Sequence, residues 1–132
     1  MSNIEIRNTK EKISSFKDLY CWKDAHSLVL EIYKTTADFP QSEIFALTNQ
    51  MRRAAVSISS NIAEGFGRQG YKEKLQFYYI SRGSLVELEN QLLIAKDIKY
   101  IGQKDYEFIN EKINKLHQLI NGFIKSTKKY LK

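Results

Sequence analysis

Apolar side chains recur at steps of three and four residues along most of the chain, which is the spacing of one face of an α-helix. The last quarter shows this most clearly, as a heptad-like seam of Tyr106, Ile109, Ile113, Leu116, Ile120, Phe123, Thr127 and Tyr130. Three earlier stripes share the period: Leu19, Trp22, Ala25, Val29, Ile32 and Thr36; Leu47, Met51, Ala54, Ile58 and Ile62; and Leu75, Tyr78, Leu85, Leu88, Leu92 and Ala95. No segment sustains the period-two alternation of a strand, so the pattern predicts an all-α fold.

Helix-breaking residues divide the chain at three places. Pro40, the only proline, separates the first two stripes, glycines at positions 65, 67 and 70 separate the next two, and Gly102 should stop the third helix. We therefore predict helices over about 18–38, 43–66, 71–100 and 103–131.

Residues near these boundaries indicate how the helices begin and end. Ser15 with Asp18 resembles a capping box for the first helix. Ser42 is a plausible N-cap for the second helix. Gly65 or Gly67 should end the second helix in the left-handed conformation that glycine adopts readily.

The predicted connections are short, so successive helices must pack antiparallel. That arrangement is an up-down-up-down antiparallel four-helix bundle over residues 16–132, preceded by a flexible N-terminal tail over residues 1–15. The chain has 132 residues, enough for one hydrophobic core but not for two. A single domain is therefore predicted.

The composition is that of an ordinary soluble protein, with 42% apolar and 27% charged residues. No apolar run reaches the length of a membrane span. The first fifteen residues lack the apolar segment of a secretory signal, so we expect a cytoplasmic protein without membrane association. The single cysteine, Cys21, cannot form an internal disulfide, which fits a reducing compartment.

The net charge of +6 is concentrated in two stretches. Residues 51–82 hold six basic and two acidic residues, and residues 125–132 hold four lysines and no acidic residue. Antiparallel helices bring the second turn and the C-terminus to the same end of the bundle, where clustered cations would attract the phosphates of RNA or DNA, or an acidic partner. The candidate nucleic-acid-binding residues are Arg68, Lys72, Lys74, Lys125, Lys128, Lys129 and Lys132. The alternative is a solvated run of charge without a ligand.

Polar residues inside the second and third helices border the apolar stripes. We predict that they form a structural network that fixes helix register, with Arg82 reaching Glu64. The alternative is a phosphate or partner site. The members are Arg52, Asn61, Glu64, Arg82, Ser84, Glu87 and Glu89.

Apolar surface exceeds what one core needs on the last two helices. Phe77, Tyr78 and Tyr79 are consecutive and sweep too wide an arc to face one core, so at least one ring should point outward. Leu119, Ile124 and Leu131 widen the last apolar face in the same way. We predict a subunit interface or a stacking platform there, the alternative being rings that cover the core margin.

Candidate enzyme chemistry is weak throughout the sequence. Residues 65–70 spell G-x-G-x-x-G, but the dinucleotide-binding motif requires a preceding strand, and here a helix precedes it. Cys21, His26 and His117 have no metal-ligand spacing, and no nucleophile elbow appears. We expect no enzyme activity, no metal and no cofactor.

Four segments resemble one bacterial protein family: residues 16–25, 39–40, 52–65 and 82–92. That family comprises proteins encoded within intervening sequences of large-subunit ribosomal RNA and the accessory variability proteins of diversity-generating retroelements. The likeness spans residues 16 to 124, although Ser59 stands where such proteins often have proline. The residues carried over are Arg52, Arg53, Asn61, Glu64, Gly65, Arg82, Gly83, Ser84, Glu87 and Glu89.

This resemblance implies a homopentameric ring of four-helix subunits. For the retroelement branch it also implies binding to nucleic acid and to a reverse transcriptase. Together with the charge pattern, it leads to the hypothesis of a non-enzymatic, homo-oligomeric accessory protein that binds nucleic acid through a basic end. The alternative is a protein-interaction scaffold without nucleic-acid binding.

Overall fold

The structure is a computed structural model, which describes residues 13–131. This part of the chain contains four α-helices and no strand: α2 (Tyr20–Thr36), α3 (Leu47–Phe66), α4 (Tyr71–Asp97) and α5 (Gln103–Lys128). Two 3-10 helices, η2 (Phe16–Asp18) and η3 (Gln41–Glu43), precede α2 and α3. The prediction of an all-helical fold is therefore confirmed.

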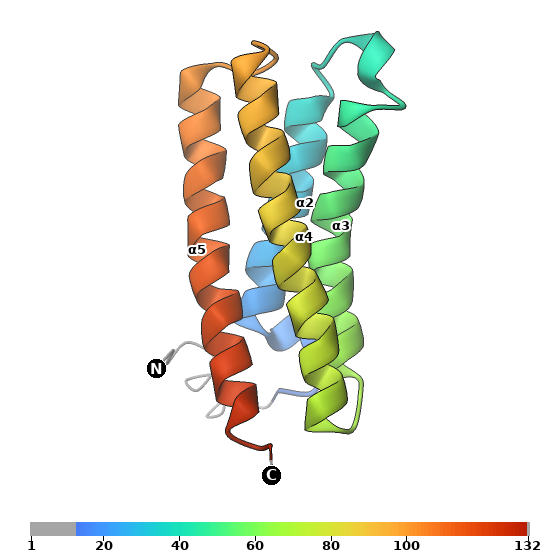
Figure 1. Cartoon of the computed structure of the whole chain (residues 1–132), viewed down its shortest axis with the longest axis vertical. Helices are drawn as coiled ribbons and strands as arrows, with labels where there is room; N and C mark the ends of the chain where they lie inside the picture. Colours follow the sequence, from blue (N-terminus) through green and yellow to red (C-terminus); the bar gives the residue numbers. More distant parts are fainter. Residues whose placement is uncertain (1–12, 132) are drawn as a thin grey trace.

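The four α-helices lie side by side, and the chain reverses direction at each connection (Figure 1). Neighbouring helices in this arrangement are α2 with α3, α3 with α4, α4 with α5, and α5 with α2. The turn between α3 and α4 and the end of α5 lie at one end of the molecule, and the connection between α2 and α3 lies at the other (Figure 1). None of the helices in the described part combines the length and apolarity needed to cross a membrane.

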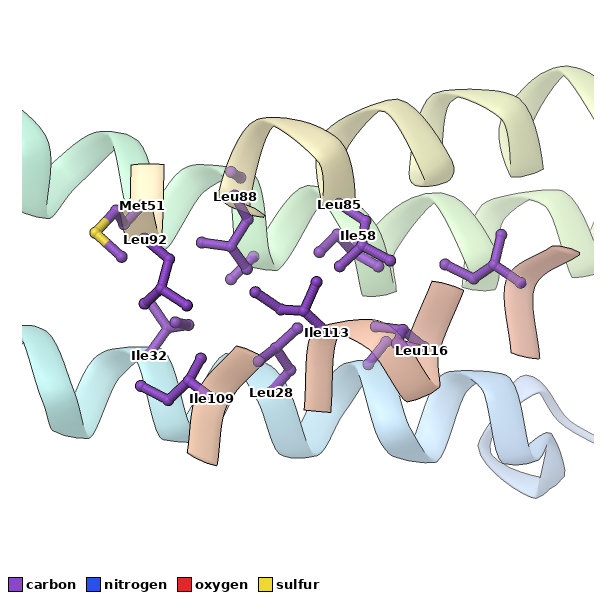
Figure 2. Packing of buried hydrophobic residues seen from close by; sticks show 14 of the residues in the cluster. Leu28, Ile32, Met51, Ile58, Leu85, Leu88, Leu92, Ile109, Ile113 and Leu116 are labelled. Carbon is purple, nitrogen blue, oxygen red and sulfur yellow. The ribbon is translucent and has the colours of Figure 1, made fainter. Parts of the chain in front are cut away.

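One core runs between the helices, and Figure 2 shows side chains from all four pointing into it. A buried aliphatic side chain of this size contributes about 1.5–3 kcal/mol relative to its exposed state. The central residues are Leu28, Ile32, Met51, Ile58, Leu85, Leu88, Leu92, Ile109, Ile113 and Leu116. The stripe predicted for the third helix is buried throughout, and that of the second helix is buried apart from half-buried Leu47.

The buried faces of α2 and α5 are rotated relative to the predicted stripes. On α2, Cys21 and Leu28 are buried, whereas Trp22 and Val29 are only half-buried. Trp22 lies at the core margin because its ring packs against Phe16 of η2 and stacks on His26. On α5, Leu119 and Ile124 are buried, whereas Tyr130 is exposed. Leu119 and Ile124 therefore belong to the core and add no outward apolar surface, whereas Leu131, the third residue of the predicted wider face, is exposed.

Five helix boundaries differ from the prediction, and one of them is the end of the last helix, which lies at Lys128 rather than near residue 131. The first helix ends at Thr36 rather than near residue 38, and its capping box, Ser15 with Asp18, begins η2 instead of α2. Ile13, which lies within the predicted tail, packs against the core. The rest of the predicted tail, residues 1–12, lies outside the described residues.

The second helix begins four residues later than predicted. Residues 41–43 form η3, and Ala46 adopts φ −124° and ψ −109°, which interrupts the helical path before Leu47. Ser42 is therefore no N-cap. Instead, the carboxylate of Glu43 accepts a hydrogen bond from the Leu47 amide at 3.2 Å and satisfies a free N–H of the first turn of α3.

Glycine has different roles from those predicted at two helix ends. Gly67 closes α3 at φ −76°, so no left-handed cap forms there. α4 ends at Asp97 rather than near residue 100, and Lys99, at φ 71°, takes the left-handed conformation instead of a glycine. Gly102 is the N-cap of α5.

Gly65 marks the closest approach of α3 to α4. A Cβ atom at this position would lie 2.6 Å from a ring carbon of Tyr78 and 3.0 Å from the Cβ of Phe77. The Tyr78 ring is buried and contacts Phe123 of α5, with centroids 4.6 Å apart, so it cannot move aside freely. Gly83 on α4 offers a contrast, since a Cβ there would meet nothing within 4 Å.

We predict that Gly65→Ala destabilises the protein, whereas Gly83→Ala does not. Overpacking a core costs about 1–3 kcal/mol, which exceeds the about 0.5–1 kcal/mol gained from the higher helix propensity of alanine. At Gly83 only the gain in propensity applies. Urea unfolding followed by circular dichroism measures both changes in the free energy of unfolding. Equal stability of the two variants would contradict the close contact.

Candidate nucleic-acid interface

Two basic stretches meet where the α3–α4 turn lies beside the C-terminal end of α5 (Figure 1). The ring of Tyr71, the first residue of α4, stacks on the ring of Tyr130 with centroids 4.8 Å apart and planes 16° apart. This contact joins the segment that carries Lys72 to the segment that carries Lys128 and Lys129. The geometry thus brings together the two stretches that the sequence analysis assigned to one end.

Lys74 has a structural role at this end. Its Nζ donates hydrogen bonds to the carbonyl oxygens of Phe66, at 2.7 Å, and Gly65, at 3.4 Å. These carbonyls belong to the last turn of α3. The Gly65 carbonyl also accepts from the Arg68 N–H at 3.1 Å, and the ammonium group adds its own hydrogen bonds at this end, so it helps to cap the helix. Burial lowers the pKa of Lys74 from its ordinary value. Lys74 is therefore a poor candidate for direct contact with a ligand.

Arg68 is held in a similar way. Its guanidinium donates to Glu64 at 3.1 Å, lies 3.9 Å from a carboxylate oxygen of Glu73, and covers the Phe77 ring at 4.8 Å from the centroid. The two carboxylates compensate its charge and the ring occupies one of its faces. Two of the seven predicted binding residues thus stabilise the α3–α4 turn.

The other predicted lysines present their charge to solvent. Lys72, Lys125, Lys128 and Lys129 are all exposed, and Lys132 lies outside the described residues. Lys72, Lys125 and Lys128 form no ion pair with any carboxylate of residues 13–131. These three lysines form the cationic surface that a polyanion would meet first.

Tyr79 is the outward-facing member of the aromatic triplet. It is 36% exposed, whereas Phe77 is half-buried and Tyr78 is 2% exposed. The Arg82 guanidinium and the Lys128 ammonium lie 5.3 and 5.8 Å from the centroid of the Tyr79 ring. We use the name basic face of α4 and α5 for four exposed residues, Lys72, Tyr79, Lys125 and Lys128, together with the half-buried Arg82. An aromatic ring between cations is an arrangement found where single-stranded nucleic acid binds.

The predicted network of polar residues is divided into separate contacts. Ser57 and Ser84 share a 2.8 Å hydrogen bond between α3 and α4, and Asn61 donates to the Ser57 carbonyl and hydroxyl. Arg82 donates to Asn121 of α5 at 3.1 Å, so the prediction that Arg82 reaches Glu64 is wrong. Glu64 pairs with Arg68 instead, because that side chain is four residues along the same helix.

The remaining members lie apart from this contact between α3 and α4. A hydrogen bond of 3.2 Å joins the Glu89 carboxylate to Nε2 of His117 on α5. Glu87 is exposed. Arg52 lies toward the other end, where its Nε donates to the Thr36 hydroxyl at 2.8 Å. These residues therefore fix helix register pairwise rather than as one network.

An open groove of about 770 Å³ lies between α2, the α2–α3 connection and α3, and the sequence analysis did not predict it. Phe45 lines it and is 91% exposed. The helix prediction had placed Phe45 inside the second helix, which hid its position before Ala46. One signal could have revealed it: Phe45 is a large apolar residue that does not continue the stripe of Leu47 and Met51.

Within residues 13–131 the structure brings together no group of three or more histidine, cysteine, aspartate or glutamate side chains that could hold a metal ion. Cys21 is buried and His117 bonds to Glu89.

Comparison with known proteins places this helical arrangement in a family. The model of the 23S rRNA-intervening sequence protein family matches residues 17–122. The chain belongs to this family. The match includes α2, α3, α4 and most of α5, whereas the lysines after residue 122 lie beyond it.

A solved structure supports the same fold for this 23S rRNA-intervening sequence family member. It is a crystal structure from Bacteroides thetaiotaomicron, described as a protein of unknown function from the S23 ribosomal protein family. The TM-score is 0.72 at 23% sequence identity, and the alignment covers 80% of this chain and 98% of the other. Among curated proteins, none matches this chain.

The two neighbouring lysines at the start of α4 should respond differently to substitution. Lys74→Ala removes the cap of α3 and should lower the free energy of unfolding by about 1 kcal/mol, since hydrogen bonds from a charged donor are lost. Lys72→Ala should change stability by less than about 0.5 kcal/mol, as expected for an exposed side chain. Thermal and urea unfolding of the two variants test this. If both variants were equally stable, Lys74 would not act as a cap.

Proposed function

We propose that this protein is a non-enzymatic, homo-oligomeric accessory protein that binds the phosphates of RNA or DNA through the basic face of α4 and α5. The observation that carries the proposal is the exposure of Lys72, Lys125 and Lys128 without carboxylate partners among the described residues, with the Lys128 ammonium over the Tyr79 ring. Point charges of this kind bind phosphate without reading sequence. A buried thiol at Cys21 suits the reducing cytoplasm in which we place this activity.

Assembly with further copies is the second part of the proposal. α4 carries apolar side chains both in the core and on the surface: Ile80, Val86, Leu93 and Ile94 are exposed, as is Ile98 directly after its last residue. We call these five residues the outer face of α4. Exposed apolar surface at helical spacing along one helix is typical of a protein–protein interface. We propose that the outer face of α4 contributes to a ring of up-down-up-down bundles. Resemblance to the family suggests five subunits in this ring.

The outer face of α4 also supports the alternative function, a protein-interaction scaffold without nucleic-acid binding. In that case the outer face would contact a different protein, and the lysines would only keep the protein soluble. By resemblance to the retroelement branch, a reverse transcriptase is the candidate partner. The two functions differ in whether nucleic-acid affinity depends on the basic face.

Replacing Lys72, Lys125 and Lys128 together by glutamine should weaken binding to RNA and DNA. The slope of log affinity against log salt should become shallower by roughly two to three, since each lost phosphate contact accounts for about 0.7–0.9. A control of equal charge is the triple substitution of Lys34, Lys99 and Lys104 by glutamine, because these exposed lysines lie at the opposite end (Figure 1).

Fluorescence anisotropy with labelled RNA and DNA over a salt series measures both variants. If the two triple variants bind alike, the basic face is not the binding surface. If the wild-type protein binds neither RNA nor DNA at low salt, the scaffold function is preferred.

Introducing charge on the outer face of α4 should dissociate the assembly. Leu93→Glu with Ile94→Glu places two carboxylates where the proposed interface excludes water, which costs several kcal/mol per unpaired buried charge. Phe108→Glu on α5 is a matched control, because Phe108 is exposed at 51% on another helix. Light scattering should give a smaller mass for the double variant alone. An unchanged mass would show that the outer face of α4 is not the subunit interface.

A further inference from the structure

The groove beside Phe45 lies at the end of the molecule opposite the basic face. Its volume is about 770 Å³, within the size range of ligand-binding clefts in proteins. We call it the Phe45 groove, and its main lining residues are Tyr33, Ile44, Phe45, Asn49, Arg52 and Arg53. None of the residues that line it is an aspartate or glutamate.

The conformation of the α2–α3 connection explains why Phe45 is exposed. η3 ends at Glu43 and α3 starts at Leu47, so Phe45 belongs to neither helix. Ala46 adopts a non-helical conformation, and the Phe45 side chain remains 91% exposed. Glu43 anchors the segment on both sides, accepting from the Leu47 amide at 3.2 Å and from the Tyr100 hydroxyl at 2.8 Å. The ring is thus presented to solvent by an anchored segment.

The two arginines of the groove differ in how much of their hydrogen-bonding capacity is used. Arg52 is oriented by the Thr36 hydroxyl at 2.8 Å, by the Tyr33 carbonyl at 3.4 Å and by the Tyr33 ring, 4.6 Å from its guanidinium carbon. Arg53 is exposed and has no hydrogen bond or ion pair with any of residues 13–131. The groove therefore offers one positioned cation and one whose donors are all available.

These groups match the chemistry of a nucleotide. The guanidinium groups fit phosphate oxygens, which they bind in a bidentate manner. The exposed Phe45 ring offers an apolar face to a planar base, and the Asn49 amide can donate to and accept from a base edge. An acidic peptide would satisfy the arginines but would leave the Phe45 ring without a planar partner. Charge and ring together favour a nucleotide.

We propose that the Phe45 groove binds an unpaired nucleotide of single-stranded nucleic acid, with the base stacked on Phe45 and the phosphate held by Arg53 and Arg52. The inference rests on the proposed nucleic-acid binding and adds a preference for single strands to it. In a duplex each base is already stacked on its neighbours, so it cannot stack on Phe45 as well. The basic face of α4 and α5, in contrast, can hold the phosphates of either form.

Substitutions in the groove should lower affinity for single strands selectively. The probes are a fluorescein-labelled oligouridylate and a labelled RNA duplex of the same length, measured by anisotropy at low salt. Phe45→Ala should weaken oligouridylate binding about tenfold, the range expected for loss of one stacked base, and should leave duplex binding unchanged. Arg53→Gln should weaken oligouridylate binding and make its salt slope shallower by about 0.7.

Phe108→Ala is the matched control, because Phe108 is also an exposed phenylalanine but lies on α5 away from the groove. A direct readout comes from Phe45→Trp, which should retain oligouridylate affinity and show quenched emission when the base stacks. Phe108→Trp should show no such change. The wild-type protein gives the background from Trp22.

The outcomes separate this inference from the proposed function. If the lysine triple variant loses binding to both probes while Phe45→Ala and Arg53→Gln bind like the wild type, the groove inference is wrong and the proposed function stands. If the groove variants lose oligouridylate binding while the lysine variant keeps it, the groove is supported and the basic face is not.

Two further results would overturn the inference. Absence of binding to either probe would reject both nucleic-acid sites. A lower mass of Phe45→Ala in light scattering, with unchanged oligouridylate affinity, would assign the groove to a contact between subunits instead.

Discussion

The close approach of α3 and α4 at Gly65 determines the structure of the basic end. Because Gly65 has no side chain, the Tyr78 ring of α4 lies against the backbone of α3 and extends to Phe123 of α5. With Tyr78 fixed inward, the next residue, Tyr79, must point outward, where Arg82 and Lys128 meet its ring. A single missing methyl group therefore couples core packing to the arrangement of surface charge.

The same approach also determines which cations remain available to a ligand. α4 starts so near the last turn of α3 that Lys74 reaches the carbonyls of Gly65 and Phe66. Arg68 is compensated within the turn by Glu64 and Glu73. A count of basic residues along the sequence treats all of these alike, whereas the fold separates those that cap a helix from those that face solvent.

The helical fold and most of the core could be predicted because a periodic pattern repeats over many residues. A wrong assignment of one residue to the buried face does not change the predicted helix. Boundaries depended on one or two residues and were less predictable. Ser42 has the right chemistry for an N-cap, but Glu43 reaches the Leu47 amide from a 3-10 turn, a contact that depends on the path of the whole connection. The left-handed residue at the end of α4 is Lys99, where sequence alone favours a glycine.

The candidate sites were predictable to different degrees. The convergence of the two basic stretches follows from helix lengths and antiparallel packing. Both can be inferred from the apolar periodicity and the short connections in the sequence. The partner of Arg82 was not predictable, because Asn121 lies on another helix and its register against α4 is set by the packed core. The Phe45 groove was missed because it exists only where α3 starts late and leaves an aromatic residue outside both neighbouring helices.

The internal cap formed by Lys74 has a kinetic consequence. A lysine that donates to carbonyl oxygens still carries its positive charge, so it contributes to the long-range potential at this end even though it makes no contact with a ligand. Under the proposed function, Lys74 would accelerate the diffusional encounter with a polyanion, while dissociation would depend on the solvent-facing lysines. In the proposed function, encounter with a polyanion and its retention would therefore depend on different side chains of the same basic end.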